Sequence, residues 1–192
     1  MRKYIIILIL FLSNIFPQKI YQNDDVGVGF DISSPNILTG IYFYSTDEIQ
    51  IGYYIDIKGS YSSVIGQDNY YDKSTTWGST LGDNQLDEKT EMSIMNIGLI
   101  KYISSLNKYI YGGIGYYGEQ KYVKFYDKYH ILGKNGEYWV NGSDVKSGLN
   151  ICGGIIIIPK DDSFINQIKV GMNTKPLEIN FGLGWSMFRG LF

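Results

Sequence analysis

The stretch EINFGLGWSMF, residues 178–188, alternates between two kinds of side chain. One set is large and apolar: Ile179, Phe181, Leu183, Trp185 and Met187. The other set is small or polar: Glu178, Asn180, Gly182, Gly184 and Ser186. Because successive side chains of a β-strand point to opposite faces, this pattern predicts a strand with one apolar face. Whether protein or lipid covers that apolar face decides the class of the protein.

The same alternation recurs along the chain between short turn sequences. It is clearest in VGVGFDI, residues 26–32, and in IQIGYYIDIK, residues 49–58. Further strands are expected at 37–45, 91–102, from 108 into the 120s, at 149–158 and at 164–173. With residues 178–188 this makes eight strands, an even number. The pattern therefore predicts an all-β, eight-stranded antiparallel up-and-down barrel that spans a membrane.

The expected connections differ in length. Short turns are expected at TDE (46–48), SSLN (104–107) and PKDDS (159–163). Two connections are long, residues 60–89 and 127–145, and both fall at the opposite end of the barrel. Outer-membrane barrels have short periplasmic turns and longer outside loops. The first and seventh connections are short, so the asymmetry is incomplete.

A secreted, lipocalin-like soluble barrel would carry the apolar faces inside, and its strand charges would simply be solvated. Its outer surface would then be rich in glycine, which weakens strands and suits a crowded interior better. The charged residues share the glycine-bearing face and have mixed signs, so they could pair across a narrow lumen. The predicted lumen network comprises Asp31, Asp56, Lys58, Glu119, Lys121, Lys169 and Glu178.

The chain opens with MRKYIIILILFLSNIFPQ, in which two basic residues precede a short apolar run. This is typical of a secretory signal peptide, with a buried first helix as the alternative. We expect a signal peptide at 1–18 and a single barrel domain at 19–192. The net charge of −2 becomes more negative without Arg2 and Lys3, which argues against binding to nucleic acid. Cys152 is the single cysteine, so no intramolecular disulfide is expected.

A signal peptide, eight alternating strands and a terminal aromatic residue, Phe192, together resemble the small outer-membrane barrels of the OmpX and opacity-protein type. The resemblance covers the mature chain and rests on architecture. It implies location in the outer membrane, contact with outer-membrane lipid, and recognition of Phe192 by the barrel-assembly machinery. The match is imperfect, because Leu191 rather than Phe192 is in phase with Trp185.

The residues that could carry out catalysis are few. His130 is the only histidine. Some small outer-membrane barrels modify lipids with a histidine and a serine, and Ser143 or Ser147 would have to approach His130 for this chemistry. Nothing in their spacing requires that, so we expect no enzymatic activity. One histidine and one cysteine do not suggest a metal site, and the glycine-rich strands do not predict a cofactor.

Residues 120–148 are the most informative part of the predicted outside surface. Asn135-Gly136 predicts a hairpin turn between YHIL and EYWV. Such a hairpin could display Tyr129, Tyr138 and Trp139 to an extracellular partner; alternatively these aromatics could pack onto the barrel rim. The sequence therefore favours a structural or surface-interaction role resembling adhesion, without a wide pore. A narrow channel, a lipid-modifying enzyme and a soluble binding barrel are the alternatives.

Overall fold

The computed structural model describes residues 25–47, 50–60, 64, 67, 69–72, 85–130, 136–158 and 166–186. For residues 143 and 144 only the backbone is described, and not the side chains. The expected signal peptide at 1–18 and the terminal Phe192 lie outside the described residues. No helix in the described part of the chain is long and apolar enough to cross a membrane.

Within these ranges the chain forms strands and one short 3₁₀ helix, Ser104–Leu106. The strands of the barrel are β1 (Asp25–Ser34), β2 (Leu38–Thr46), β3 (Ile51–Ser60), β5 (Gln85–Ile103), β6 (Lys108–Tyr126), β7 (Glu137–Ile157), β8 (Gln167–Thr174) and β9 (Leu177–Ser186). The two-residue strand β4 (Tyr70–Tyr71) lies outside this set and pairs in parallel with β7.

The eight long strands close into a ring. Each pairs antiparallel with its neighbours in the order β1, β2, β3, β5, β6, β7, β8 and β9, and β9 pairs with β1 again. The first and last strands join over most of their length, with Ile32 opposite Phe181 and Gly27 opposite Ser186. The predicted eight-stranded antiparallel barrel is therefore confirmed.

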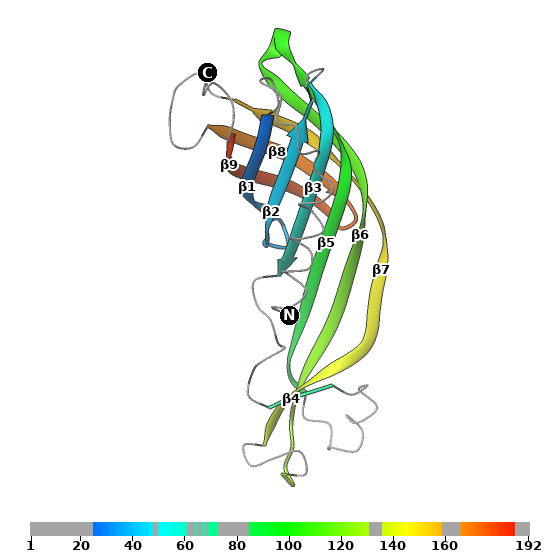
Figure 1. The fold of residues 1–192 in the computed structure, drawn as a ribbon. Coiled ribbons are helices and arrows are strands. Elements are labelled where there is room, and N and C mark those ends of the chain that lie inside the picture. The colour runs from blue at the N-terminus through cyan, green and yellow to red at the C-terminus, as the bar shows by residue number, and fades with distance from the viewer. Residues whose placement is uncertain are drawn as a thin grey trace.

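Three strands are much longer than the other five. β5 and β6 have 19 residues each and β7 has 21, whereas the others have 8 to 10. β3 stops pairing with β5 at Ser93, and β8 stops pairing with β7 at Cys152. Beyond these points β5, β6 and β7 continue as a three-stranded sheet, which runs past the ends of the other strands in Figure 1. We call residues 85–92, 119–126 and 137–149 of this sheet the extension.

The predicted hairpin within residues 120–148 is present as part of this sheet. Tyr126 pairs with Glu137 at its far end. The turn differs from the expected one, since Asp127–His130 have left the strand conformation and YHIL does not begin as a strand. Gly136 has φ +69°, as a turn glycine commonly does. Asn135 lies outside the described residues.

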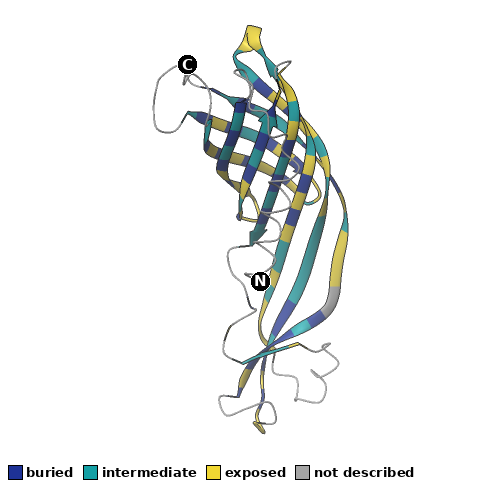
Figure 2. Cartoon of the chain, viewed as in Figure 1, coloured by how far each residue is buried: buried dark blue, intermediate teal, exposed yellow. Residues whose placement is uncertain are grey.

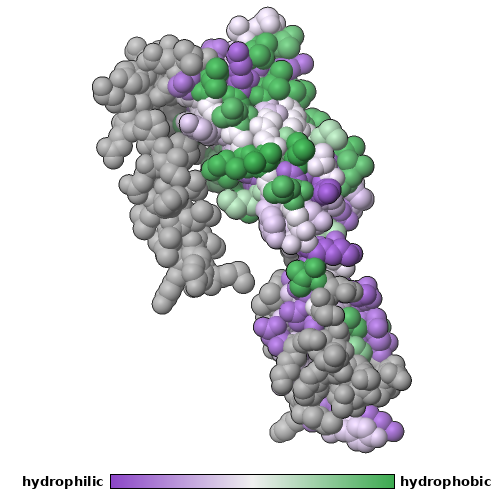
Figure 3. Space-filling model, turned by 90° about the vertical axis from the view of Figure 1, so that its right-hand side faces the viewer, coloured by the Kyte–Doolittle hydropathy of each residue, from purple (hydrophilic) through white to green (hydrophobic). Residues whose placement is uncertain are grey.

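Most apolar side chains of the barrel strands face outward, although a few, such as Ile100 and Ile156, are buried in the interior. Ile51 and Leu183 are 38% and 51% exposed, whereas Tyr54 and Gly184 are buried inside. Figure 2 shows exposed and buried residues alternating along the strands, and Figure 3 shows hydrophobic side chains gathered over the barrel. A soluble barrel would have the reverse orientation, so this surface is the one that lipid requires.

The interior is filled mainly by tyrosines that lie over glycines. Tyr42, Tyr44, Tyr54, Tyr109 and Tyr111 belong to one buried cluster. A methyl group at Gly171 would overlap the hydroxyl of Tyr111, and one at Gly184 would overlap that of Tyr42. The inward glycines therefore make room for these rings, as the sequence predicted for a crowded interior.

Candidate functional site

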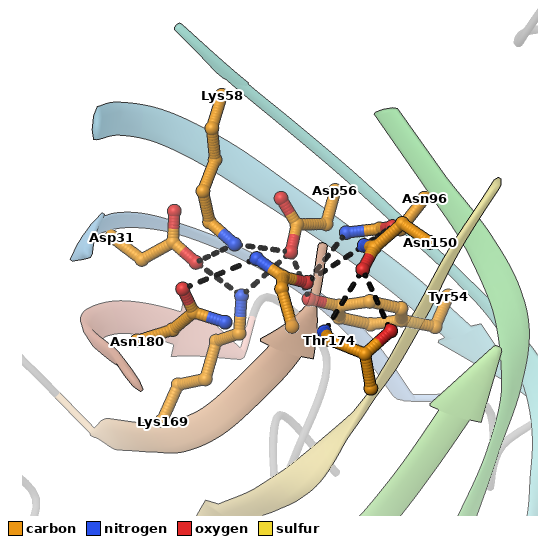
Figure 4. A network of polar contacts seen from close by, with 10 residues as sticks. Asp31, Tyr54, Asp56, Lys58, Asn96, Asn150, Lys169, Thr174 and Asn180 are labelled. Carbon is orange, nitrogen blue, oxygen red and sulfur yellow. Dashed lines mark hydrogen bonds and ion pairs between the residues drawn. The ribbon is translucent and has the colours of Figure 1, made fainter. Parts of the chain in front are cut away.

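Four charged side chains meet inside the barrel, contributed by three strands. Asp31 comes from β1, Asp56 and Lys58 from β3, and Lys169 from β8. The Lys58 Nζ atom lies 2.7 Å from Asp56 Oδ2 and 3.3 Å from Asp31 Oδ2. Lys169 contacts Asp31 and lies 3.3 Å from Asp56 Oδ2. Figure 4 shows the four side chains converging on one point, which we call the ion cluster.

The ion cluster has two positive and two negative groups, and its side chains are at most 1% exposed. Buried ions are tolerated only when their charges are paired and hydrogen-bonded. Tyr54 donates a hydrogen bond to Asp56 Oδ2 at 2.9 Å, and the Lys169 ammonium lies 4.7 Å from the centre of the Tyr42 ring. These contacts tie β2 to the three strands that carry the charges.

A second interior layer consists of asparagines from four strands. These residues are Asn96, Asn150, Asn173 and Asn180. The Asn150 amide donates to Asn96 Oδ1 at 2.7 Å and to Asn173 Oδ1 at 3.1 Å. Asn150 Oδ1 accepts hydrogen bonds from the backbone N–H groups of Thr174 and Lys175, both at 3.0 Å. This layer therefore holds the β8–β9 turn, and sequence reasoning missed it.

A third polar group fixes the end of the barrel with the short turns. Asp25 is buried at the start of β1 and accepts hydrogen bonds from Tyr44, Tyr109 and Ser186. Ser186 is the last residue of β9, so this carboxylate joins the first and last strands of the barrel. Gln167 donates to the Tyr44 hydroxyl at 2.6 Å and extends the chain of hydrogen bonds inward. Sequence reasoning did not single out Asp25.

The remaining residues of the predicted lumen network lie elsewhere. Glu178 is buried and accepts a hydrogen bond from Asn36 at 3.0 Å, without reaching the ion cluster. Glu119 lies 3.3 Å from Lys146, and Lys121 lies 2.8 Å from Glu88, all with partly exposed side chains. Glu119 and Lys121 belong to the extension, because β6 continues past the closed barrel.

The predicted surface aromatics are not equivalent in the structure. Tyr129 is 70% exposed, whereas Tyr138 and Trp139 are 3% and 6% exposed. Trp139 packs with Val64 and Tyr122 in a small apolar cluster that Tyr70 also contacts. Of the two alternatives, display of Tyr138 and Trp139 is corrected, because both are buried, and Trp139 packs on Val64 and Tyr122. Tyr129 alone of the three is exposed.

The cluster around Trp139 is supported by charged and polar neighbours. The Lys89 ammonium lies 4.6 Å from the centre of the Trp139 ring, which is a cation–π distance. Burial, together with the nearby Glu91 carboxylate, raises the pKa of Tyr122 to about 12. The Tyr122 phenol therefore stays protonated in the folded extension at neutral pH. These contacts give the extension a folded core of its own.

The structure does not bring His130 close to Ser147, the described serine that was considered as its catalytic partner. His130 is exposed in the turn beyond Tyr126 and Glu137. Ser147 lies further along β7 opposite Gly118, and the strand between Glu137 and Ser147 spans about 30 Å. The side chain of Ser143 lies outside the described set. Over the described ranges no group of three or more possible metal ligands occurs.

No protein-family model matches the sequence, and no curated protein matches it either. Among solved structures, the chain is similar to the crystal structure of Ail, the attachment invasion locus protein of Yersinia pestis. The identity is 10% and the TM-score 0.47, over 84% of this chain and 94% of that one. Ail in a phospholipid bilayer nanodisc, described as an outer membrane protein, has 12% identity and a TM-score of 0.45, over 85% and 98%. Neisserial surface protein A has 7% identity and a TM-score of 0.33, over 85% and 92%.

Proposed function

We propose that the chain is an outer-membrane barrel with a surface-interaction role, and that the extension is its contact element. The observation that carries this proposal is the difference in strand length. Five strands end at the barrel rim, whereas β5, β6 and β7 continue together as one sheet. A strand that only has to cross the bilayer needs about 9–11 residues, so half of each long strand has another use.

The outer surface of the barrel supports the membrane location. Outward positions on β9 carry Leu177, Ile179, Phe181 and Leu183, all more than half exposed. A soluble protein seldom exposes so large an apolar surface. Tyrosines pack the interior, and the ion cluster carries no net charge, since each of its two lysines contacts both aspartates. The barrel is therefore suited to anchor the extension.

The extension has the properties of a rigid projection. From Gly118 to Tyr126, β6 continues for about 26 Å along the strand beyond the last pair of β3 and β5. It pairs with β5 on one side and β7 on the other, and the Trp139 cluster packs at its far part. Outside loops of outer-membrane barrels face the cell exterior, so the extension would stand on the cell surface.

The experiment compares the whole chain with a barrel-only variant. Residues 60–92 and 119–146 are each replaced by Asn-Gly, which joins Gly59 to Ser93 and Gly118 to Ser147, two pairs that lie opposite each other on neighbouring strands. The ion cluster is untouched, so the variant should keep a gel mobility that shifts on boiling. Cells that display the whole chain should be retained on gelatin-coated glass under flow, and cells with the barrel-only variant should not. Equal retention would remove the extension from any role in adhesion.

A further inference from the structure

We propose that the barrel interior conducts protons between its two ends and excludes larger ions. This inference is independent of the surface role of the extension, because it concerns the closed barrel alone. Two buried carboxylates lie near the ends of the interior, Asp25 beside the short turns and Glu178 beside the β8–β9 turn, and the ion cluster lies between them. Ionisable side chains inside a membrane-spanning protein commonly mark a proton relay.

The section of the path between the ion cluster and Glu178 follows the seam of β1 and β9. Ser33 lies two residues after Asp31 on the inward face of β1. It pairs with Asn180 of β9, which lies two residues after Glu178. Among the described residues, Asp31 Oδ1, Ser33 Oγ and Glu178 Oε2 have no hydrogen-bond partner, although all three residues are buried. Because buried polar groups are hydrogen-bonded as a rule, and same-face neighbours in a sheet are about 7 Å apart, one bridging water fits between successive members.

The ion cluster passes a proton on without a change in its net charge. Asp56 Oδ1 also has no hydrogen-bond partner within the described ranges, so it is open to a proton. Lys58 and Lys169 each contact both aspartates, and Figure 4 shows their ammonium groups between the two carboxylates. When Asp56 takes up a proton, a lysine ammonium transfers one of its own protons to Asp31 and regains one from Asp56. One proton has then entered the cluster, and one leaves it through Asp31.

Phenol groups continue the path from the ion cluster to Asp25. Tyr54 donates to Asp56 Oδ2 at 2.9 Å, and its ring stacks on that of Tyr111 with a centroid distance of 4.3 Å. The Tyr111 hydroxyl is another buried group with no hydrogen-bond partner in the described part of the chain. Tyr44 lies opposite Tyr54 in the ladder of β2 and β3, and it donates to Asp25 Oδ2 at 3.4 Å. A phenol both donates and accepts, so these hydroxyls and a water beside Tyr111 complete the path.

The same interior excludes alkali and halide ions. Tyrosine rings pack over glycines, and the side chains of the ion cluster are at most 1% exposed, so an ion cannot pass with its hydration shell. Passage without that shell carries a large dehydration cost. A proton moves between hydrogen-bonded groups and needs no open pore. The path is therefore selective for protons.

The test measures proton flux into vesicles that contain the whole chain. Assembled barrels are reconstituted into phosphatidylcholine vesicles that enclose potassium chloride and the pH dye pyranine. Valinomycin is added so that potassium leaving the vesicles balances the charge of the protons that enter. Acid is then added outside, and the initial rate of the pyranine response is recorded.

Two variants interrupt the path at its two ends. Tyr44→Phe removes the hydroxyl that donates to Asp25. Glu178→Gln removes the carboxylate at the other end and keeps an oxygen that accepts from Asn36. Both changes preserve the size of the side chain, and heat-modifiable gel mobility gives the fraction of assembled barrels by which each flux is divided.

Two matched controls make the same chemical changes outside the path. Tyr53→Phe removes the hydroxyl of an outward tyrosine that is 63% exposed. Glu137→Gln removes a partly exposed carboxylate of the extension. Neither change touches the barrel interior, so both controls should conduct protons as the whole chain does.

We expect proton flux above that of protein-free vesicles for the whole chain and both controls. The flux should be about tenfold lower for Tyr44→Phe and for Glu178→Gln, because each variant breaks one link of the path. Planar bilayers in potassium chloride should show no conductance steps. Flux equal to that of protein-free vesicles, or undiminished flux in either path variant, would overturn the inference. Conductance steps in potassium chloride would overturn it as well, and would favour a narrow ion channel.

Discussion

Asp31 on β1 and Lys169 on β8 pair inside the barrel across a third strand, because the residue between them is Gly182. Gly182 on β9 lies opposite both Asp31 and Lys169 in the ladder. It has no side chain, so the lysine and the carboxylate meet over it, and neither is exposed to solvent. The closing seam of the barrel is thus bridged by a charge pair as well as by backbone hydrogen bonds.

The first prediction concerns the loss of one cation from the ion cluster. Lys169→Met leaves two buried carboxylates with Lys58 as their remaining partner in the cluster, so the variant should lose about 3–5 kcal/mol of unfolding free energy. The urea midpoint, read from heat-modifiable gel mobility in lipid vesicles, measures this loss. Lys175→Met, at an exposed turn position, is the control and should leave the midpoint unchanged. Lys169→Met combined with Asp31→Asn should regain part of the loss, and its failure to do so would contradict the pairing.

A second prediction follows from the contact between Tyr111 and Gly171. Gly171→Ala should cost about 1–3 kcal/mol, because the new methyl group overlaps the Tyr111 hydroxyl. Tyr111→Phe removes that hydroxyl and should partly restore the urea midpoint of the Gly171→Ala variant. Gly112→Ala is the matched control, since its methyl group would have its nearest neighbour, the Cys152 carbonyl oxygen, at 3.8 Å. Additive effects of the Gly171 and Tyr111 changes would show that the two residues do not meet.

The orientation of the strands gives a third prediction. In a Cys152→Ser background, a spin label is attached at position 183 in place of Leu183. Oxygen dissolved in the lipid should accelerate the relaxation of this label, and a water-soluble nickel complex should not. A label at Tyr129 should show the opposite behaviour, because Tyr129 is 70% exposed in the turn that follows β6 at the far end of the extension. In the natural chain, buried Cys152 should react with maleimide only after unfolding. A label at Leu183 that water reaches as readily as it reaches Tyr129 would exclude a lipid-facing surface.

The barrel and its orientation could be predicted from the sequence because a period of two encodes them directly. Ile51 and Gly52 fall on opposite faces of any strand, and only a lipid-facing barrel puts the isoleucine outside. The four members of the ion cluster were predicted as lumen residues from the same parity. That they meet at one level depends on the stagger between strands, which pairs Asp31 with Gly182 and Gly182 with Lys169. Alternation within single strands does not contain this information.

The extension was less predictable for a related reason. Residues 85–90 were expected to lie in a loop, because nearly all of their side chains are polar on both faces. Their strand is defined instead by its pairing with β6. The sequence left open whether Tyr138 and Trp139 are displayed or packed, and Trp139 is buried by contacts with residues as distant in sequence as Val64. Such long-range contacts leave no local pattern. The inward asparagines did share the parity of the lumen residues, so that signal was present and was not used.

The raised pKa of Tyr122 gives a prediction about alkaline pH. The folded value of about 12 exceeds the ordinary value of 10.0, so the stability that Tyr122 contributes is complete below pH 10 and is lost as the pH rises through 12. Cleavage of the extension by proteinase K should therefore accelerate between pH 10 and 12. Tyr122→Phe has no ionisable group there and should reduce this acceleration. An identical pH profile for the variant would assign the effect to other residues.

The last prediction separates the folding of the extension from that of the barrel. Trp139→Ala removes the ring that packs on Val64 and Tyr122 and lies under the Lys89 ammonium, so the extension should become sensitive to trypsin. The barrel should keep its heat-modifiable mobility, because the ion cluster belongs to β1, β3 and β8. Lys89→Gln should have a smaller effect, of about 0.5–1 kcal/mol, since it removes only the cation–π contact. Tyr129→Ala, which changes an exposed ring, is the control and should leave the cleavage rate unaltered. If Trp139→Ala instead lowers the stability of the barrel itself, the extension and the barrel unfold as one unit and the extension cannot be treated as a separate element.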